Sequence, residues 1–188
     1  MAIEQQGMTL EAFLALSEEK PALEYRDGRV TQKEMPKGTH GWLQSWLVQL
    51  FNTFSTGLDR LCAFTETRVT YAGISVVPDV CVYVLERAPV DDRGRVAEDF
   101  VTPPDLIVEI SSPGQSLTEL RRRCQWFVDH DVQIALLVHP RGEWIERFES
   151  GHEPRSYRGD QPADLGRIAP GLAVIPSALF GALQIRPR

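Results

Sequence analysis

The sequence predicts a mixed α/β (α+β) fold in which helices flank a central β-sheet. The chain has 188 residues, enough for one domain with a full hydrophobic core. Segments with helical periodicity alternate with short apolar runs typical of strands, which is the pattern of a sheet covered by helices. No repeat, linker or low-complexity segment divides the chain, so we expect residues 1–188 to form a single domain.

The chain opens with signals for a helix and a hairpin. Residues 9–17 place apolar side chains on one face of a short helix. Residues 23–26 and 29–31 then flank Asp27 and Gly28, a pair suited to the positive φ angles of a tight hairpin turn. A β-hairpin is therefore predicted here.

A longer helix and two strands follow. Apolar residues recur at helical spacing from residue 38 onward, and Gly57 is the expected end of this helix. Residues 61–71 and 76–85 predict strands. Residues 86–104 are rich in charge, proline and glycine, and predict a long surface loop.

The second half of the chain begins with a buried strand at residues 106–110. Ser116 and Glu119 form a capping box that starts a helix reaching about residue 130. Residues 134–138 predict another buried strand, so the intervening helix allows a right-handed parallel crossover. The expected closing elements are edge strands at 144–148 and 155–157 and a short helix at 177–183.

Composition limits the classes of function. No apolar run approaches the ~20 residues of a membrane helix, and the N-terminus lacks the pattern of a signal peptide, so a cytoplasmic location is expected. The cysteines Cys62, Cys81 and Cys124 form no CxxC pair and predict buried free thiols. The net charge of −6 argues against nucleic-acid binding through bulk electrostatics, so any such contact needs a local basic patch and metal ions.

Two acidic residues stand within or beside apolar strands. Asp79 precedes the apolar run 80–85, and Glu109 ends the run 106–110. Carboxylates in such places are costly unless they are paired or bind a metal, and together they could hold a hard divalent cation. The alternative is that Asp79 caps a strand and Glu109 pairs with an arginine. By alternation alone, Glu24 is interpreted as facing solvent.

Several basic residues offer further candidates. Of Arg121, Arg122 and Arg123, helical rotation lets one face the acids while the others face water. His40 begins the long helix and lies either near the site or only near the helix cap, the interpretation we favour. His130, His139 and His152 show no metal-ligand spacing.

Several short stretches, taken in order, resemble the Uma-two family of restriction-endonuclease-like proteins, within the PD-(D/E)XK nuclease superfamily. They are LEYRDGRV at residues 23–30, His40 at a helix start, PDV at 78–80 and PDLIVEISSP at 104–113. The resemblance extends through the segments 116–130, 136–140 and 170–172, and covers about residues 8–183.

The resemblance implies a restriction-endonuclease-like core and a Mg²⁺ (or Mn²⁺) site. It implies that Asp79 and Glu109 bind the metal, with the carbonyl of Ile110 as a further ligand and Glu24 as an additional acid. The activity implied is metal-dependent hydrolysis of DNA phosphodiester bonds.

Two positions depart from the family pattern. The family's catalytic lysine usually lies on the helix after the glutamate, and that position is Arg123 here, followed by Phe127. Arginine stays charged and cannot act as a base, although it can stabilise charge on a phosphate. His139 stands where the family often has an acid, and we have no functional account of that change.

Three functions are therefore considered. The first is a Mg²⁺- or Mn²⁺-dependent endonuclease acting on DNA, for which a two-fold homodimer would suit cleavage of both strands. The second is a catalytically silent scaffold that acts as a binding or regulatory module, favoured by Arg123 and the acidic net charge. The third is hydrolysis of another phosphate ester. A nuclease needs a basic rim around the acids, and the candidates are Lys37, Arg68, Arg121 and Arg122.

Overall fold

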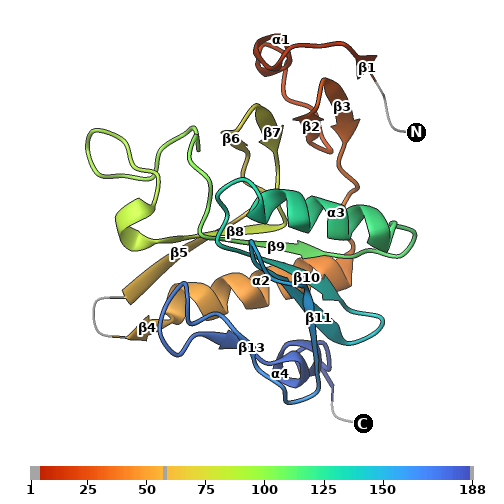
Figure 1. Cartoon of the computed structure of the whole chain (residues 1–188), viewed down its shortest axis with the longest axis vertical. Helices are drawn as coiled ribbons and strands as arrows, with labels where there is room; N and C mark the ends of the chain where they lie inside the picture. The colour runs from red at the N-terminus through yellow and green to blue at the C-terminus, as the bar shows by residue number, and fades with distance from the viewer. Residues whose placement is uncertain (1–4, 57–58, 187–188) are drawn as a thin grey trace.

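The computed structural model describes residues 5–56 and 59–186. Within these residues, three α-helices cover a large central sheet, the short first helix lies beside the N-terminal hairpin of a smaller sheet, and a pair of short strands completes the fold (Figure 1). This arrangement confirms the predicted mixed fold. None of the helices in the described residues is long and apolar enough to cross a membrane.

The central sheet contains the buried strands that the sequence predicts. Within the described residues its order is β12–β11–β10–β9–β8–β5–β4. In that order the strands span Arg155–Arg158, Trp144–Phe148, Ile134–His139, Leu106–Ile110, Val80–Val84, Asp59–Thr65 and Ser55–Thr56. Strands β9 and β10 are parallel and are joined by helix α3 (Leu117–Val128), which confirms the predicted crossover connection. The Ser116 hydroxyl accepts a hydrogen bond from the Glu119 amide at the start of α3, which is the first of the two bonds of a capping box.

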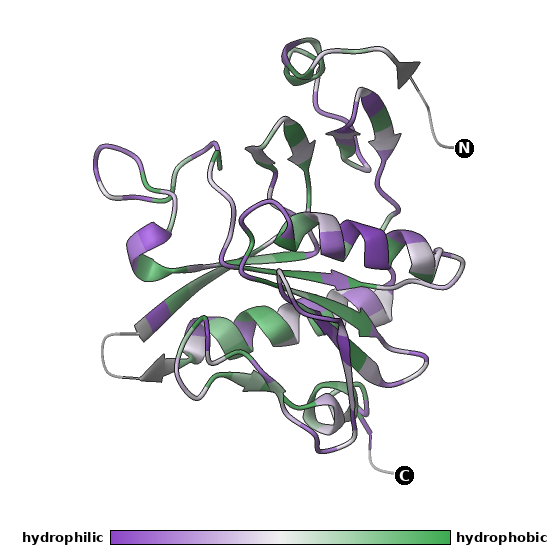
Figure 2. Cartoon of the chain, viewed as in Figure 1, coloured by the Kyte–Doolittle hydropathy of each residue, from purple (hydrophilic) through white to green (hydrophobic). Residues whose placement is uncertain are grey.

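Helices cover both faces of the central sheet (Figure 1). Helix α2 (Gly38–Thr53) and helix α4 (Pro176–Gly181) lie on one side, and α3 lies on the other. Alternation along β9 assigns its side chains to these two layers, because successive residues of a strand face opposite ways. Leu106 and Val108 join the apolar cluster that contains α2, whereas Ile107 joins the cluster that contains α3. Figure 2 shows the resulting concentration of hydrophobic residues in the central strands.

The smaller sheet lies on the α3 side of the molecule (Figure 1). Its described strands run in the order β1–β3–β2–β7–β6 and span Gln5–Gln6, Arg29–Gln32, Leu23–Arg26, Ile74–Val76 and Val69–Tyr71. Asp27 and Gly28 have φ angles of 53° and 75°, so the predicted tight turn is present. Tyr25 pairs with Ser75, and this pairing fixes the N-terminal hairpin against the β6–β7 hairpin.

Two predicted strands are each divided in two. The strand expected at 61–71 ends at Thr65, where Glu66 adopts a φ of 48° and redirects the chain into β6. The strand expected at 76–85 is interrupted by residues 77–79, because Pro78 has no amide to donate to a sheet. The helix α2 ends at Thr53, so the expected end at Gly57 is wrong, and Gly57 itself lies outside the described residues.

The other elements largely follow the sequence. Helix α1 spans Leu10–Leu14 with Thr9 as its cap, and the expected loop at 86–104 carries one short 3-10 helix, Leu85–Arg87, at its start. The short strands β13 and β14, Ala163–Asp164 and Ala173–Val174, were not predicted. The three cysteines are free thiols; Cys81 and Cys124 are buried as expected, and Cys62 is half-buried.

Candidate functional site

A cleft of about 440 Å³ opens between the N-terminal hairpin, the start of α2, strand β9 and helix α3. Among the described residues, its charged lining consists of five acids, three basic residues and one histidine. They are Glu24, Glu34, Asp79, Glu109, Glu119, Arg26, Lys33, Arg123 and His40. The cleft therefore gathers residues that are far apart in the sequence and carries an excess of carboxylates.

Asp79 lies at the floor of the cleft, directly before strand β8, and is only 2% exposed. Its Oδ1 lies 2.7 Å from Lys33 Nζ and 3.2 Å from His40 Nε2, and its Oδ2 accepts a hydrogen bond of 2.6 Å from the Ile110 amide. Burial alone would raise the pKa of Asp79, but His40 and Lys33 outweigh burial and hold this pKa at about 2. Asp79 is therefore a carboxylate throughout the physiological pH range.

The Lys33 ammonium bridges two carboxylates. Besides Asp79, it contacts both oxygens of Glu66 at 3.0 and 2.9 Å. Gln44 steadies this arrangement, since its Nε2 donates to Glu66 Oε1 at 2.6 Å and to the Asp79 carbonyl at 3.1 Å. Burial would lower the pKa of Lys33, but the charge of Asp79 overcomes this effect and raises the pKa above its ordinary value. Lys33 is therefore a cation held inside the cleft.

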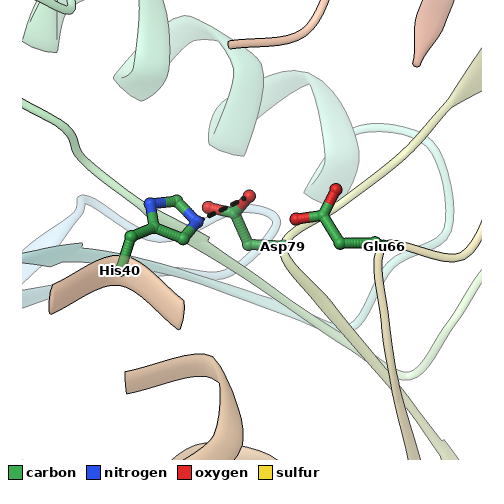
Figure 3. Close-up of side chains that lie close together, drawn as sticks. All are labelled: His40, Glu66 and Asp79. Atoms are coloured by element: carbon green, nitrogen blue, oxygen red, sulfur yellow. Dashed lines mark ion pairs between the residues drawn. The ribbon is translucent and has the colours of Figure 1, made fainter. Parts of the chain in front are cut away.

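His40 points into the same group, and Figure 3 shows its ring directed at the Asp79 carboxylate, with Glu66 on the far side. Its Nδ1 lies 3.2 Å from the Ser112 hydroxyl, whereas its buried Nε2 has no hydrogen-bond partner of suitable geometry among the described residues. One ligand atom from each of His40, Glu66 and Asp79 lies within 4.8 Å of the other two, so this group could hold a metal ion. His40 Nε2 is buried and has Asp79 Oδ1 as its near neighbour, so a bound cation could take both atoms as ligands.

Glu109 enters the cleft from β9. It is two residues from Ile107 and so faces α3, where Arg123 donates from Nε to Glu109 Oε1 at 2.8 Å. The two terminal nitrogens of Arg123 bind the Glu24 carboxylate at 2.7 and 2.8 Å, and Glu24 also accepts the Val77 amide at 2.7 Å. One guanidinium thus joins helix α3 to the central sheet and to the N-terminal hairpin.

The pKa values of Glu24 and Glu109 shift in opposite directions, although both side chains are buried. Burial would raise the pKa of Glu24, but the charge and hydrogen bonds of Arg123 and the Val77 amide lower it below its ordinary value. Burial also raises the pKa of Glu109, to about 7, because Arg123 opposes it incompletely and the neighbouring charge of Asp79 reinforces it. Glu109 therefore gains or loses a proton near neutral pH.

The resemblance to the family implied four site residues, and all four line this cleft: Glu24, Asp79, Glu109 and Arg123. The solvent-facing interpretation of Glu24 is wrong, because its side chain is buried by Arg123 and the hairpin. The alternative pairing of Glu109 with an arginine is also present. His40 is a cleft residue, and the cap interpretation that we favoured for it is wrong.

The predicted basic rim is not where the sequence suggested. Lys37, Arg68, Arg121 and Arg122 do not line the cleft. Arg121 binds Glu146 at 2.7 Å, and Arg68 donates to the Leu23 carbonyl, because their positions on α3 and beside β6 point them elsewhere. His139, for which the sequence offered no role, stacks on Trp144 at a turn.

Sequence reasoning missed Lys33 and Glu66. A signal for Lys33 was available, since a two-residue turn pairs Glu24 with Thr31, and paired residues face the same side of a hairpin. Lys33 is two residues beyond Thr31 and so shares that face. No comparable signal marks Glu66, whose place depends on the interruption between β5 and β6.

Comparison with known proteins gives matches over most of the chain. A family model described as "Uma2: Putative restriction endonuclease" matches residues 10–179. A crystal structure of a "putative nuclease belonging to DUF820" from Anabaena variabilis is similar with a TM-score of 0.87 and 32% identity, covering 94% of this chain and 99% of that chain. A cryo-EM structure of a DrdV–DNA complex has a TM-score of 0.34 and 11% identity, covering 77% of this chain and 11% of that chain. No protein with a curated description matches.

Proposed function

The chain belongs to the Uma2 (Uma-two) family of restriction-endonuclease-like proteins, and we propose that it is an endonuclease that hydrolyses DNA phosphodiester bonds with Mg²⁺ or Mn²⁺. We propose further that residues 1–188 act as one domain. The observation that carries the proposal is the buried pair Asp79 and Glu109 in a charged cleft, with the buried His40 Nε2 at 3.2 Å from Asp79.

The residues of the cleft suit a hard divalent cation. Asp79 and Glu109 supply carboxylate oxygens, and the Ile110 peptide lies against Asp79 because its amide donates to that side chain. We assign Asp79, Glu109 and the Ile110 carbonyl as the ligands, with His40 available on the other side of Asp79. A divalent ion bound here would polarise a phosphoryl oxygen and activate water for attack on phosphorus.

Arg123 and Glu24 have supporting roles in this proposal. Arg123 keeps a permanent positive charge in the cleft, where it offsets part of the negative charge of the carboxylates and orients Glu109. Glu24 fixes the guanidinium through two parallel hydrogen bonds. Because arginine does not release a proton, Arg123 cannot serve as the base of the reaction.

DNA is the proposed substrate, and the acidity of the cleft restricts how it can bind. The cleft lining carries more acids than basic residues, so phosphate groups would be repelled without a cation. We therefore propose that DNA binds together with the metal. A homodimer would place two clefts on the two strands, and light scattering of the purified protein tests this state.

The test compares wild type with Asp79→Asn and Glu109→Gln. The exposed loop residue Asp92, outside the cleft, provides the matched control Asp92→Asn. We expect wild type and the control to bind Mn²⁺ in calorimetry and to cleave plasmid DNA, and both cleft variants to lose binding and cleavage. Cleavage that survives in the cleft variants, or that needs no divalent ion, would contradict the proposal.

A second candidate is a catalytically silent nuclease fold that acts as a binding or regulatory module. The resemblance implies that Arg123 stands where the family usually has a lysine. Its guanidinium is engaged with carboxylates, and the expected basic rim does not line the cleft. Mn²⁺ binding in wild type without cleavage of plasmid, linear or single-stranded DNA would favour this candidate.

A further inference from the structure

The cleft contains a lysine that comes from a different element than the one expected. The sequence has only three lysines, at positions 20, 33 and 37, and all three lie in the described part of the chain. Of these, Lys33 alone lines the cleft. We propose that Lys33, carried by the N-terminal hairpin, is the catalytic lysine of this nuclease and that Arg123 is a positioning residue. This inference rests on the proposed endonuclease function.

The contacts of Arg123 leave it little freedom to assist a substrate. Its Nε and both terminal nitrogens already donate to Glu109 and Glu24 at 2.7–2.8 Å. A guanidinium held in this way fixes the direction of Glu109 and joins α3 to the hairpin. To contact a phosphate fully, Arg123 would have to abandon one of these carboxylates inside the protein, which is costly.

Lys33 is placed differently. Its ammonium lies 2.7 Å from Asp79 Oδ1, an atom of the carboxylate proposed to bind the metal. A divalent ion on Asp79 would compete with the ammonium for that carboxylate. The flexible four-carbon stem of lysine allows the ammonium to turn away from Asp79 while it keeps its contact with Glu66. The released donor would then be free to bind a phosphate oxygen in the cleft.

The role that follows is electrostatic. The Lys33 ammonium donates a hydrogen bond to a non-bridging oxygen of the scissile phosphate and stabilises the negative charge that grows there as water attacks. This role requires no proton release from Lys33. Glu66 and Gln44 position the lysine, since Gln44 holds Glu66, which in turn holds the ammonium.

The competition between Lys33 and the ion gives the proposal a distinctive signature. Loss of the lysine charge removes a competitor for Asp79 and should leave metal binding intact or tighten it, while it slows cleavage. A purely structural lysine would instead weaken metal binding when removed, because the cleft would lose its shape. Loss of cleavage without loss of metal affinity is therefore the result expected if Lys33 acts on the substrate.

The experiment compares wild type, Lys33→Met and the matched control Lys20→Met, which removes the same charge at an exposed site outside the cleft. Thermal unfolding checks the fold, calorimetry with Mn²⁺ alone measures affinity, and single-turnover cleavage of plasmid DNA measures rate. For Lys33→Met we expect a cleavage rate lower by about 100-fold or more. The Kd for Mn²⁺ should be unchanged or several-fold lower, and Lys20→Met should match wild type.

A charge-balanced variant keeps the test decisive if Lys33→Met does not fold. Lys33→Met combined with Glu66→Gln removes one positive and one negative charge from the pair, and Glu66→Gln alone is its reference. The same loss of cleavage relative to that reference is expected.

Two results would overturn the inference. One is a Lys33→Met protein that cleaves within threefold of wild type. The other is a Kd for Mn²⁺ that rises tenfold or more along with the loss of cleavage, which would show a structural role. Either result leaves the endonuclease proposal standing as long as wild type cleaves. A wild type that does not cleave refutes the proposed function and the role of Lys33 together.

Discussion

Replacing Arg123 with methionine tests whether the guanidinium at the centre of the cleft holds three parts of the protein together. The side chain of Arg123 is 15% exposed and makes three short hydrogen bonds to two buried carboxylates. Removing one partner of a buried ion pair typically costs about 3–5 kcal/mol of the free energy of unfolding, because a charge is left unpaired. For a chain of this size that corresponds to a fall in Tm of roughly 6–20 °C.

Because the pKa of Glu109 is raised, we expect the loss in free energy of unfolding to lie toward the lower end of the range of about 3–5 kcal/mol. With a pKa near 7, Glu109 can take up a proton once Arg123 is gone, whereas Glu24, whose pKa is lowered, cannot do so easily. Adding Glu24→Gln to Arg123→Met should therefore recover part of the lost stability. The control is Arg122→Met, the exposed neighbour on the same helix, which should change stability by less than about 0.5 kcal/mol.

Urea unfolding followed by circular dichroism measures all four proteins. A loss of less than about 1 kcal/mol in Arg123→Met would contradict this expectation, since the hydrogen bonds around the guanidinium would then contribute no more than an exposed pair. The expectation also fails if adding Glu24→Gln destabilises Arg123→Met further, because an unpaired Glu24 charge would then not be the cause.

Two further predictions concern the metal and DNA. A metal ligand must be ionised, and Asp79 is already charged near neutral pH, so the proton on Glu109 should control the affinity. We expect the affinity for Mn²⁺, measured by calorimetry, to fall about tenfold per pH unit below pH 7 and to level off above it. An affinity that is flat from roughly pH 5.5 to 8 would contradict the assignment of Glu109 as a metal ligand. Because acids outnumber basic residues in the cleft, DNA should bind weakly in EDTA and at least about tenfold more tightly with Ca²⁺. Fluorescence anisotropy measures both affinities. Equal binding in the two buffers would indicate that DNA binds outside the cleft.

Local signals in the sequence determined most of the fold. The pair Asp27 and Gly28 specified the hairpin turn, the apolar run at Leu106–Ile110 specified a buried strand, and Ser116 specified the start of α3. Each of these depends on neighbours within a few residues, through turn angles, side-chain alternation or capping. The order of these elements was enough to predict a sheet between helices, with a parallel crossover around α3.

The candidate acids were also accessible from the sequence, but only in part through physical reasoning. Asp79 and Glu109 stood out because carboxylates beside apolar strands need a partner. For Glu24 alternation predicted exposure, and it was the family resemblance that connected it with the site. Alternation states which side of a strand a residue faces and does not state what covers that side, which here is helix α3.

Tertiary structure alone decided which cation accompanies each acid. Arg123 and Glu24 are 99 residues apart in sequence, and Lys33 reaches Asp79 and Glu66 from a separate sheet, so no local pattern specifies these contacts. Their formation requires the hairpin to dock beside the ends of the central strands, through pairing between β2 and β7. The sequence determined the residues available for chemistry. The docking of the two sheets determined that a lysine lies against Asp79 while an arginine joins Glu24 and Glu109, because long-range packing sets which charges share one buried space.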